Sequence, residues 1–557
     1  MVSAEQSRRG GLGRGRARAV GSLPWVALLL VSAAFGVPSQ QTQAQTRGAA
    51  EDWFYSNLPY GLTHDTDARL EAVLPAPDSK AACDRFWAAL DPVTEKIVTS
   101  SRTDSELRSL QADMIVCGKR LFFDLPLETN VPIPDLLLQA LLQTFPEITG
   151  RAFTSLGLRE NPREPGWPLE LPRVPGALSR PRDYLTGPVR TMSCPACHLG
   201  QLPDGRYATG MPNDNLDLGR FNQLVVYPIW LAGHGKKDPF PWDPELDAQY
   251  RAMLKSSRGR VNLPRVLFDV TYLIDILNLE RTLYRFAGQE PLPLSDQRTF
   301  YRSGRGRLNP ATPMLSEPHH EIYVSTPPIW QMRHFENDPK GMGEPYFGRV
   351  ISSRNLDEFA RQAIVMSTLA PNLATPRHTD PLVAYLRTLV EPPNLRGADA
   401  ALFSAGQEIF KSACTSCHDG HNGATRRNHD LDDVGTPHVF DEIFHDYSPP
   451  TAQSRLTLQG LEKVGMLPLA RRGVKSRRLQ GLWARQRLAV NGAIEGLDHL
   501  LCLNGRTRQQ LDRKDPLADS THTDLCDGYS MDQRQALRHY LEHVRYDRFG
   551  QALTPAP

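Results

Sequence analysis

Two stretches in the last third of the chain carry apolar residues at helical spacing behind a residue that can cap a helix. In the first, Asp399 precedes an apolar face formed by Leu402, Phe403, Gly406, Ile409 and Phe410. In the second, Ser530 and Gln533 have the spacing of a capping box, and the following apolar face consists of Leu537, Tyr540, Leu541 and Val544. The period of these positions predicts one amphipathic helix in each stretch. We therefore expect a mostly α-helical fold.

A second pattern occurs once in each half of the chain. The run Gly118-Lys-Arg-Leu-Phe-Phe-Asp124 places a glycine before an apolar cluster, as Gly406-Gln-Glu-Ile-Phe410 does later. Likewise, Thr326-Pro-Pro-Ile-Trp330 has a counterpart in Leu479-Gln-Gly-Leu-Trp483, and a proline-rich run at residues 391–395 lies between the two halves. The repeat predicts two related domains, at residues 80–390 and 398–548. The 46 prolines and 41 glycines favour long irregular connections, above all as insertions in the first domain.

The N-terminal segment has the composition of a signal peptide. A basic region is followed by an apolar stretch at residues 23–37, and Thr42-Gln-Ala44 is typical of a cleavage site. The apolar stretch is shorter than the roughly 20 residues that span a bilayer. We expect removal of residues 1–44 and a periplasmic or secreted mature chain with no integral membrane segment. An uncleaved anchor is the alternative.

Charge and cysteine content narrow the classes further. A formal net charge of +2 on 557 residues offers no basic patch for nucleic acid. Of the eight cysteines, four lie in two Cys-x-x-Cys-His runs, and the others form one pair before these runs and one pair after them. In an oxidising compartment we expect the disulfides Cys83–Cys117 and Cys502–Cys526. Four buried free thiols are the alternative.

The two runs are Cys194-Pro-Ala-Cys197-His198 and Cys414-Thr-Ser-Cys417-His418. Two thiols at this spacing can add across the two vinyl groups of one haem, and the adjacent histidine then reaches the iron. A thioredoxin-like redox pair and a zinc half-site are the alternatives. A redox pair does not need the histidine, however, and a zinc site needs a second pair of ligands. The runs therefore predict two covalently bound c-type haems, with His198 and His418 as iron ligands.

The sixth ligand of each iron decides between electron relay and reaction with a small oxidant. For the second haem the favoured candidate is His522, just before the last predicted helix, and the competitor is Met466, at a spacing typical of small cytochromes c. Methionine would raise the reduction potential and histidine would lower it. For the first haem we find no convincing ligand, and the candidates are His234, His319, His320 and His334.

These residues together resemble the bacterial di-haem cytochrome c peroxidase superfamily, which includes the methylamine-utilisation di-haem enzyme and the larger rubber-oxygenase-like and fatty-acid dioxygenases. The resemblance rests on both haem runs and on residues 118–124, 326–330 and 475–484. It implies two cytochrome c-like domains packed face to face, one haem with an open axial site, and a histidine over the other haem at the place of His522. It also makes Trp330 and Trp483 candidates for an electron relay, although packing against porphyrin is an equally good role for each.

The chain departs from this family in two places. Family members often carry Pro-Tyr-Leu-His-Asn-Gly where this chain has Arg487-Leu-Ala-Val-Asn-Gly492, so Val490 stands in the place of their histidine. The stretches 124–194 and 198–414 are also much longer than in compact peroxidases, and in this they resemble the oxygenase branch. Related peroxidases hold a Ca²⁺ ion between their domains, and its ligands cannot be placed in this chain.

Three functions remain open at this point. The first is a peroxidase that uses peroxide at the first haem and receives electrons, through the second haem, from a small cytochrome or cupredoxin. The second is a dioxygenase that acts on an apolar unsaturated substrate, held by apolar walls near Trp330, Tyr346 and Phe347. The third is a non-catalytic electron carrier with two six-coordinate haems. The resemblance favours the peroxidase.

Overall fold

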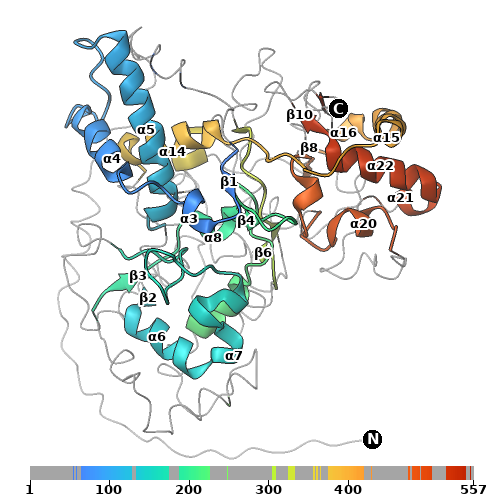
Figure 1. Ribbon diagram of the computed structural model, residues 1–557, viewed down its shortest axis with the longest axis horizontal. Coiled ribbons are helices and arrows are strands. Elements are labelled where there is room, and N and C mark those ends of the chain that lie inside the picture. The colour runs from blue at the N-terminus through green and yellow to red at the C-terminus, as the bar shows by residue number, and fades with distance from the viewer. Residues whose placement is uncertain are drawn as a thin grey trace, which may run out of the picture. The chain divides into compact units, whose positions relative to one another are not determined.

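The computed structural model describes residues 54, 58, 64–127, 133–174, 187–225, 248, 304–308, 324–332, 356–357, 359–361, 364, 374–418, 428–429, 474–476, 479–489, 491–504, 522, 524–546 and 552–553. All of them belong to one unit, Arg47–Pro557. Within these residues helices predominate (Figure 1). Every described strand is two or three residues long. The expectation of a mostly α-helical fold is confirmed, whereas the domain boundaries at 80–390 and 398–548 stay predictions. None of the described helices has the length and hydropathy of a membrane span.

Three helices form the N-terminal helical layer: α4 (Ser79–Ala88), α5 (Asp104–Asp124) and α14 (Pro376–Thr388). A capping box starts α5, because the Thr103 hydroxyl accepts from the Glu106 N–H while the Glu106 carboxylate accepts from the Thr103 N–H at 2.7 Å. α5 packs against both α4 and α14. This long helix is therefore the element around which the first half is built.

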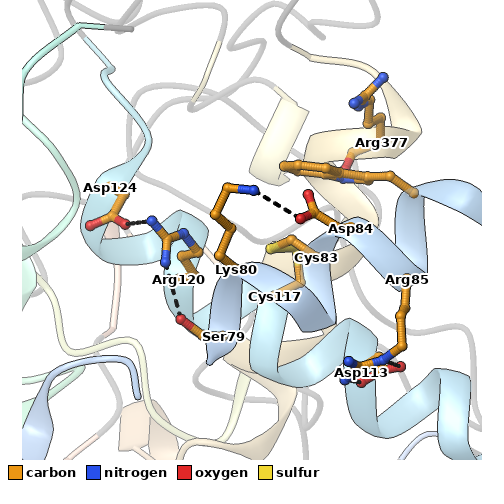
Figure 2. The surroundings of a disulfide bond; sticks show 11 residues. Ser79, Lys80, Cys83, Asp84, Arg85, Asp113, Cys117, Arg120, Asp124 and Arg377 are labelled. Carbon is orange, nitrogen blue, oxygen red and sulfur yellow. Dashed lines mark hydrogen bonds and ion pairs between the residues drawn. A yellow bond between two sulfur atoms is a disulfide. The ribbon is translucent and has the colours of Figure 1, made fainter. Parts of the chain in front are cut away.

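The expected disulfide between Cys83 and Cys117 is present and joins α4 to α5 (Figure 2). The Cα atoms of the two cysteines lie 4.6 Å apart, and both side chains are buried. Further along the two helices, the Arg85 guanidinium donates to the Asp113 carboxylate at 2.8 Å. The second expected disulfide, Cys502–Cys526, is also present. The cysteine pairing derived from the oxidising compartment is confirmed at both places.

Glycine allows the same close crossing of two helices in both halves. A Cβ atom on Gly118 would lie 1.8 Å from the Pro381 carbonyl oxygen of α14. A Cβ atom on Gly406, in α15 (Ala400–Ala413), would lie 2.1 Å from the Ala536 carbonyl oxygen of the neighbouring helix α22 (Met531–His543). In each case a tyrosine lies beside the glycine, Tyr385 in the first half and Tyr540 in the second. The sequence repeat thus corresponds to a repeated helix crossing.

The two predicted C-terminal helices are confirmed as α15 (Ala400–Ala413) and α22 (Met531–His543), which lie side by side. Asp399 caps α15 by accepting from the N–H groups of Ala401 and Leu402, each at 2.9 Å. Ser530 and Gln533 form the expected capping box on α22. The assignment of Leu402 to the buried face is wrong, since its side chain is 41% exposed. The face that meets α22 is narrower and consists of Phe403, Gly406 and Phe410.

The remaining described elements are short and connect these helices. The other helices are α3 (Leu70–Val73), α6 (Asp135–Thr144), α7 (Pro146–Thr149), η2 (Arg151–Leu156), α8 (Pro195–His198), α16 (Thr415–His418), η8 (Leu482–Ala484), α20 (Gly496–Leu500) and α21 (Asp524–Asp527). The three-stranded antiparallel sheet has the order β1 (Thr66–Asp67), β5 (Tyr207–Thr209), β4 (Leu199–Gln201). The antiparallel pairs are β2 (Ile133–Pro134) with β3 (Val189–Arg190), β6 (Arg307–Leu308) with β7 (Val324–Ser325), β8 (Asn428–His429) with β9 (Val474–Lys475), and β10 (Arg545–Tyr546) with β11 (Ala552–Leu553).

A buried arginine fixes the segment that leads into the first Cys-x-x-Cys-His run. Arg190 has no exposed surface, and its Nε donates to the Asp135 carboxylate at 2.9 Å. The same guanidinium donates to the Glu164 carboxylate at 2.6 Å and lies 4.0 Å from the centre of the Trp167 ring. A buried guanidinium with two carboxylate partners and an aromatic face is well satisfied. It therefore holds β3 in place, four residues before Cys194.

Candidate functional site

The first Cys-x-x-Cys-His run forms one helical turn, α8, between β3 and β4. The His198 N–H donates to the Cys194 carbonyl at 3.0 Å, which closes the turn. The loop after β5 then binds the backbone of the run. The Gly210 N–H donates to the His198 carbonyl at 2.8 Å, and the Asn213 N–H donates to the Cys197 carbonyl at 2.9 Å. The backbone is thus held by its neighbours, and the run presents two thiols and an imidazole for chemistry.

Burial sets the protonation of these side chains. Cys194 and Cys197 are not joined by a disulfide, and burial together with the neighbouring Cys197 raises the pKa of Cys194 to about 12. Burial lowers the pKa of His198 to about 4; the nearby Pro327 carbonyl acts in the opposite direction without reaching hydrogen-bond geometry at the buried Nδ1. A redox pair relies on a thiol whose pKa is lowered, so this environment disfavours that alternative. A neutral imidazole, by contrast, is ready to ligate a metal.

The second run forms the equivalent turn, α16, directly after α15. The His418 N–H donates to the Cys414 carbonyl at 2.8 Å, and burial with the neighbouring Cys417 raises the pKa of Cys414 to about 11. The β8–β9 pair brings His429 beside this run, with its Nδ1 3.5 Å from the Cys417 Sγ. The Ser476 hydroxyl donates to the Cys417 carbonyl. Nothing in the sequence pattern singles out His429, since only the strand pairing brings it here.

His522 lies next to the histidine of the second run. The ring centres of His418 and His522 are 5.9 Å apart and the ring planes make an angle of 30°. Two imidazoles that share one metal ion, each with a ring nitrogen about 2 Å from it, have their centres roughly 6 Å apart. His522 also has a φ of 65°, a left-handed backbone that is uncommon outside glycine. Its competitor Met466 lies outside the described residues.

The four histidines that the sequence offers for the first haem also lie outside the described residues; they are His234, His319, His320 and His334. The same holds for Tyr346 and Phe347, the suggested walls of an apolar substrate chamber, and for Val490.

Trp330 lies between backbone from both halves of the chain. Its side chain is 1% exposed, and its Nε1 donates to the Thr209 carbonyl, at the end of β5, at 2.7 Å. A Cβ atom on Gly210 would lie 2.6 Å from the indole ring, and one on Gly481 would lie 2.3 Å from it. Gly481 has a φ of 69°, so glycine is favoured there for its backbone as well. The tryptophan therefore links the first run to the segment that carries Trp483.

The short helix η8 belongs to two apolar cores. Leu482 packs in the C-terminal core, against which Cys414 also packs. The next two residues, Trp483 and Ala484, pack in the core that contains Leu199 and Trp330, against which Cys194 packs. Both tryptophan candidates thus lie in the core of the first run, and their neighbour Leu482 lies in the core of the second. One turn of backbone therefore connects the surroundings of the two runs.

Glu391, which the sequence did not single out as functional, is half-buried beside this connection. One carboxyl oxygen accepts from the Gly481 N–H at 2.6 Å, while Oε2 is buried without a hydrogen-bond partner in the described part of the chain. Burial raises the pKa of Glu391 to about 8, although the Gly481 N–H and the positive charge of Arg545 act to lower it. The carboxyl group is therefore mostly protonated at neutral pH.

A second buried ionisable pair, Asp214 and Arg485, also lies between the halves. Burial raises the pKa of Asp214 and lowers that of Arg485, and each group partly offsets the shift of the other. The Asp214 carboxylate accepts from the Gln486 N–H at 2.8 Å, and the Arg485 guanidinium donates to the Thr326 carbonyl at 3.1 Å. This pair could not be predicted from local sequence, because its members are far apart in the chain.

These surroundings suit a haem in their donor chemistry. Besides the thiols and imidazoles of the runs, the buried nitrogen atoms of these surroundings that have no hydrogen-bond partner among the described residues include Nε1 of Trp483 and Nε of Arg485. Donor groups of this kind can satisfy propionate oxygens. The zinc half-site gains no support, since the three-ligand group that lies close enough for one ion in the described ranges includes no residue of either run. No family model, curated protein or solved structure matches the chain.

Proposed function

We propose that the chain is an exported di-haem c-type oxidoreductase with peroxidase activity, built from two cytochrome c-like domains at residues 80–390 and 398–548. The observation that carries the proposal is the pair of Cys-x-x-Cys-His runs, each on one helical turn with both thiols unbridged. Export to the periplasm fits the two disulfides, since such bonds persist in oxidising compartments.

In this proposal the residues of each run have separate tasks. Cys194, Cys197, Cys414 and Cys417 attach the two haems through thioether bonds, and His198 and His418 supply the proximal imidazoles. When bound, each haem supplies an iron that exchanges single electrons and, where an axial position is open, reacts with peroxide. The 5.9 Å spacing of the His418 and His522 rings supports assigning electron transfer to the second site. Peroxide is then assigned to the first.

Electrons from a small cytochrome or cupredoxin would enter at the second site and pass to the first. Reduction of one peroxide to two waters consumes two electrons and two protons, so two donor molecules are oxidised in each turnover. Trp330 and Trp483 are the proposed relay, because they pack in the core of the first run while η8 extends into the core of the second. Trp330 is buried and Trp483 is half-buried, which limits the access of water to this path.

The attachment of haem is tested first, because every later step depends on it. The full chain is produced in a periplasm that matures c-type haems, and intact mass and haem content are measured together. We expect two haems per chain, one fewer for Cys197→Ser and one fewer for Cys417→Ser. Ser416→Ala, a change inside the second run that spares both thiols and the imidazole, serves as the control and keeps both haems. A wild-type chain without covalent haem would refute the proposal.

The activity is tested on the two-haem protein with a chemically reduced small cytochrome. We expect peroxide-dependent oxidation of two cytochromes per peroxide. Oxygen uptake with an unsaturated lipid or polyisoprene, without peroxide turnover, would refute the peroxidase and support the dioxygenase. Electron exchange with the cytochrome, without turnover of either oxidant, would support the non-catalytic electron carrier.

A further inference from the structure

The last turns of α22 carry three side chains that the proposed function does not use: His539, Glu542 and His543. Their spacing places them on one face of the helix. One possible ligand atom from each residue lies within 4.8 Å of the others. Glu542 and His543 are each 8% exposed, so the group is largely withdrawn from solvent.

Both ring nitrogens of His543 lie within hydrogen-bond distance of a backbone carbonyl oxygen. Its Nδ1 lies 2.9 Å from the His539 carbonyl oxygen, and its Nε2 lies 3.2 Å from the Arg396 carbonyl oxygen. A carbonyl oxygen can only accept, whereas a neutral imidazole has one N–H and one lone pair. In the neutral ring, therefore, one nitrogen lone pair faces an oxygen lone pair. A second proton or a metal ion at this place removes the conflict.

The side chains beside His543 can hold a metal ion at this place. The two imidazole rings have their centres 4.3 Å apart. The Nε2 of His539 accepts from the Asp399 N–H at 2.8 Å, so in the neutral ring Nε2 carries the lone pair and Nδ1 carries the proton. Nε2 is therefore the atom of His539 that would bind an ion, in exchange for this N–H. The Glu542 carboxylate supplies a negative charge, with one oxygen within 4.8 Å of a nitrogen of each ring.

We propose that His539, Glu542 and His543 form a binding site for one divalent cation of the zinc class, with the Arg396 carbonyl as a further oxygen ligand. Two imidazoles and one carboxylate are a ligand set that zinc uses in proteins. Ligand atoms on a tetrahedral ion with bonds of about 2.1 Å lie roughly 3.4 Å apart. The 3.2 Å between His543 Nε2 and the Arg396 oxygen is close to this spacing. The other ligand atoms close in by side-chain rotation.

The existing ion pair of Glu542 does not prevent this. Arg538 contacts the Glu542 carboxylate at 3.2 Å, and it also pairs with the Asp498 carboxylate. When one Glu542 oxygen turns to the ion, Arg538 keeps Asp498 as a partner. The bound ion would join the end of α22 to Arg396, which lies four residues before the start of α15. This holds whether or not the haem proposal is right.

The test uses the full chain in its purified form, first dialysed against a chelator and then titrated with Zn²⁺. Zinc and iron are counted separately by elemental mass spectrometry, so metal held elsewhere is not confused with this site. We expect one zinc per wild-type chain, with the affinity lowered at least about 10–100-fold in His539→Gln and in Glu542→Gln. The matched control is His499→Gln, because the Nδ1 of His499 accepts from the Glu495 N–H at 3.1 Å, much as His539 does from Asp399.

Zinc K-edge absorption of the wild-type protein supplies a measurement that needs no variant. It should show two imidazole ligands and light-atom oxygen ligands. Absence of stoichiometric zinc in the wild type overturns the proposal, and so does wild-type affinity in both variants. A loss of equal size in His499→Gln would also overturn it, since the effect would then not belong to this group.

Discussion

Replacing Glu391 by glutamine should make the protein more stable at neutral pH and flatten the pH dependence of its stability. The pKa of this carboxyl group is raised from the ordinary 4.5 to about 8 by burial. Below pH 4.5 the group is protonated in both folded and unfolded chains and costs nothing. As the pH rises, the unfolded chain releases the proton while the folded chain retains it, so the folded state loses stability until pH 8.

The size of the effect follows from the two pKa values. The loss in unfolding free energy is about 1 kcal/mol at pH 5 and about 3 kcal/mol at pH 7, a difference of about 2–3 kcal/mol. Glutamine keeps an oxygen for the Gly481 N–H and cannot ionise. For a chain of 557 residues that unfolds in one step, this difference amounts to a shift of about 2 °C in Tm.

Calorimetric scans of both proteins at pH 5, 6 and 7 measure the effect as a difference between two Tm curves. The Tm of the variant, relative to that of the wild type, should increase as the pH rises. Glu408→Gln, a change on the exposed surface of α15, is the control and should leave the two curves parallel. Parallel curves for Glu391→Gln would show that this carboxyl group titrates normally, and the account of its burial would then be wrong.

Three further predictions concern the C-terminal half. Gly406→Ala should lower the unfolding free energy by about 1–3 kcal/mol or more, measured in denaturant titrations, because its Cβ would press on the Ala536 carbonyl oxygen. Gly397→Ala is the control and should leave the unfolding free energy nearly unchanged, because a Cβ at Gly397 has no neighbouring atom within 4 Å. Ser530→Ala should cost about 1 kcal/mol by removing the cap of α22, measured in the same way. If the second haem has histidine on both sides, His522→Met should raise its reduction potential in a spectroelectrochemical titration, and an unchanged potential would remove His522 as the ligand.

Local signals in the sequence predicted the helices of the C-terminal half well. Asp399 and Ser530 cap where expected, because a cap depends only on the few residues that follow it. Gly406 was part of the repeated pattern, but its close contact with the Ala536 carbonyl oxygen depends on how the two helices pack and was not predicted. The prediction that Leu402 is buried was wrong, because apolar spacing alone does not show how wide the contact surface of the partner helix is. Only the narrower face of α15 meets α22.

The site was less predictable, because most of its features depend on contacts between distant segments. The two runs are visible in the sequence itself, whereas the two disulfides were expected from an oxidising compartment and their pairing is established by the structure. The burial of Glu391 depends on the Gly481 backbone, and the place of His429 depends on the β8–β9 pairing. Neither contact has a local signature. The division of η8 between two cores is of the same kind, since adjacent residues face different partners.

The two runs differ in exposure, and this difference bears on the direction of electron flow. In α8 the residues between the cysteines, Pro195 and Ala196, are buried. In α16 no residue is buried, and His522 beside it is exposed. A donor protein can touch only what reaches the surface, so the second run suits the entry of electrons. A reaction with a small oxidant needs no such access and gains from the exclusion of water. The burial of Pro195 and Ala196 is therefore consistent with the proposed peroxide reaction at the first run.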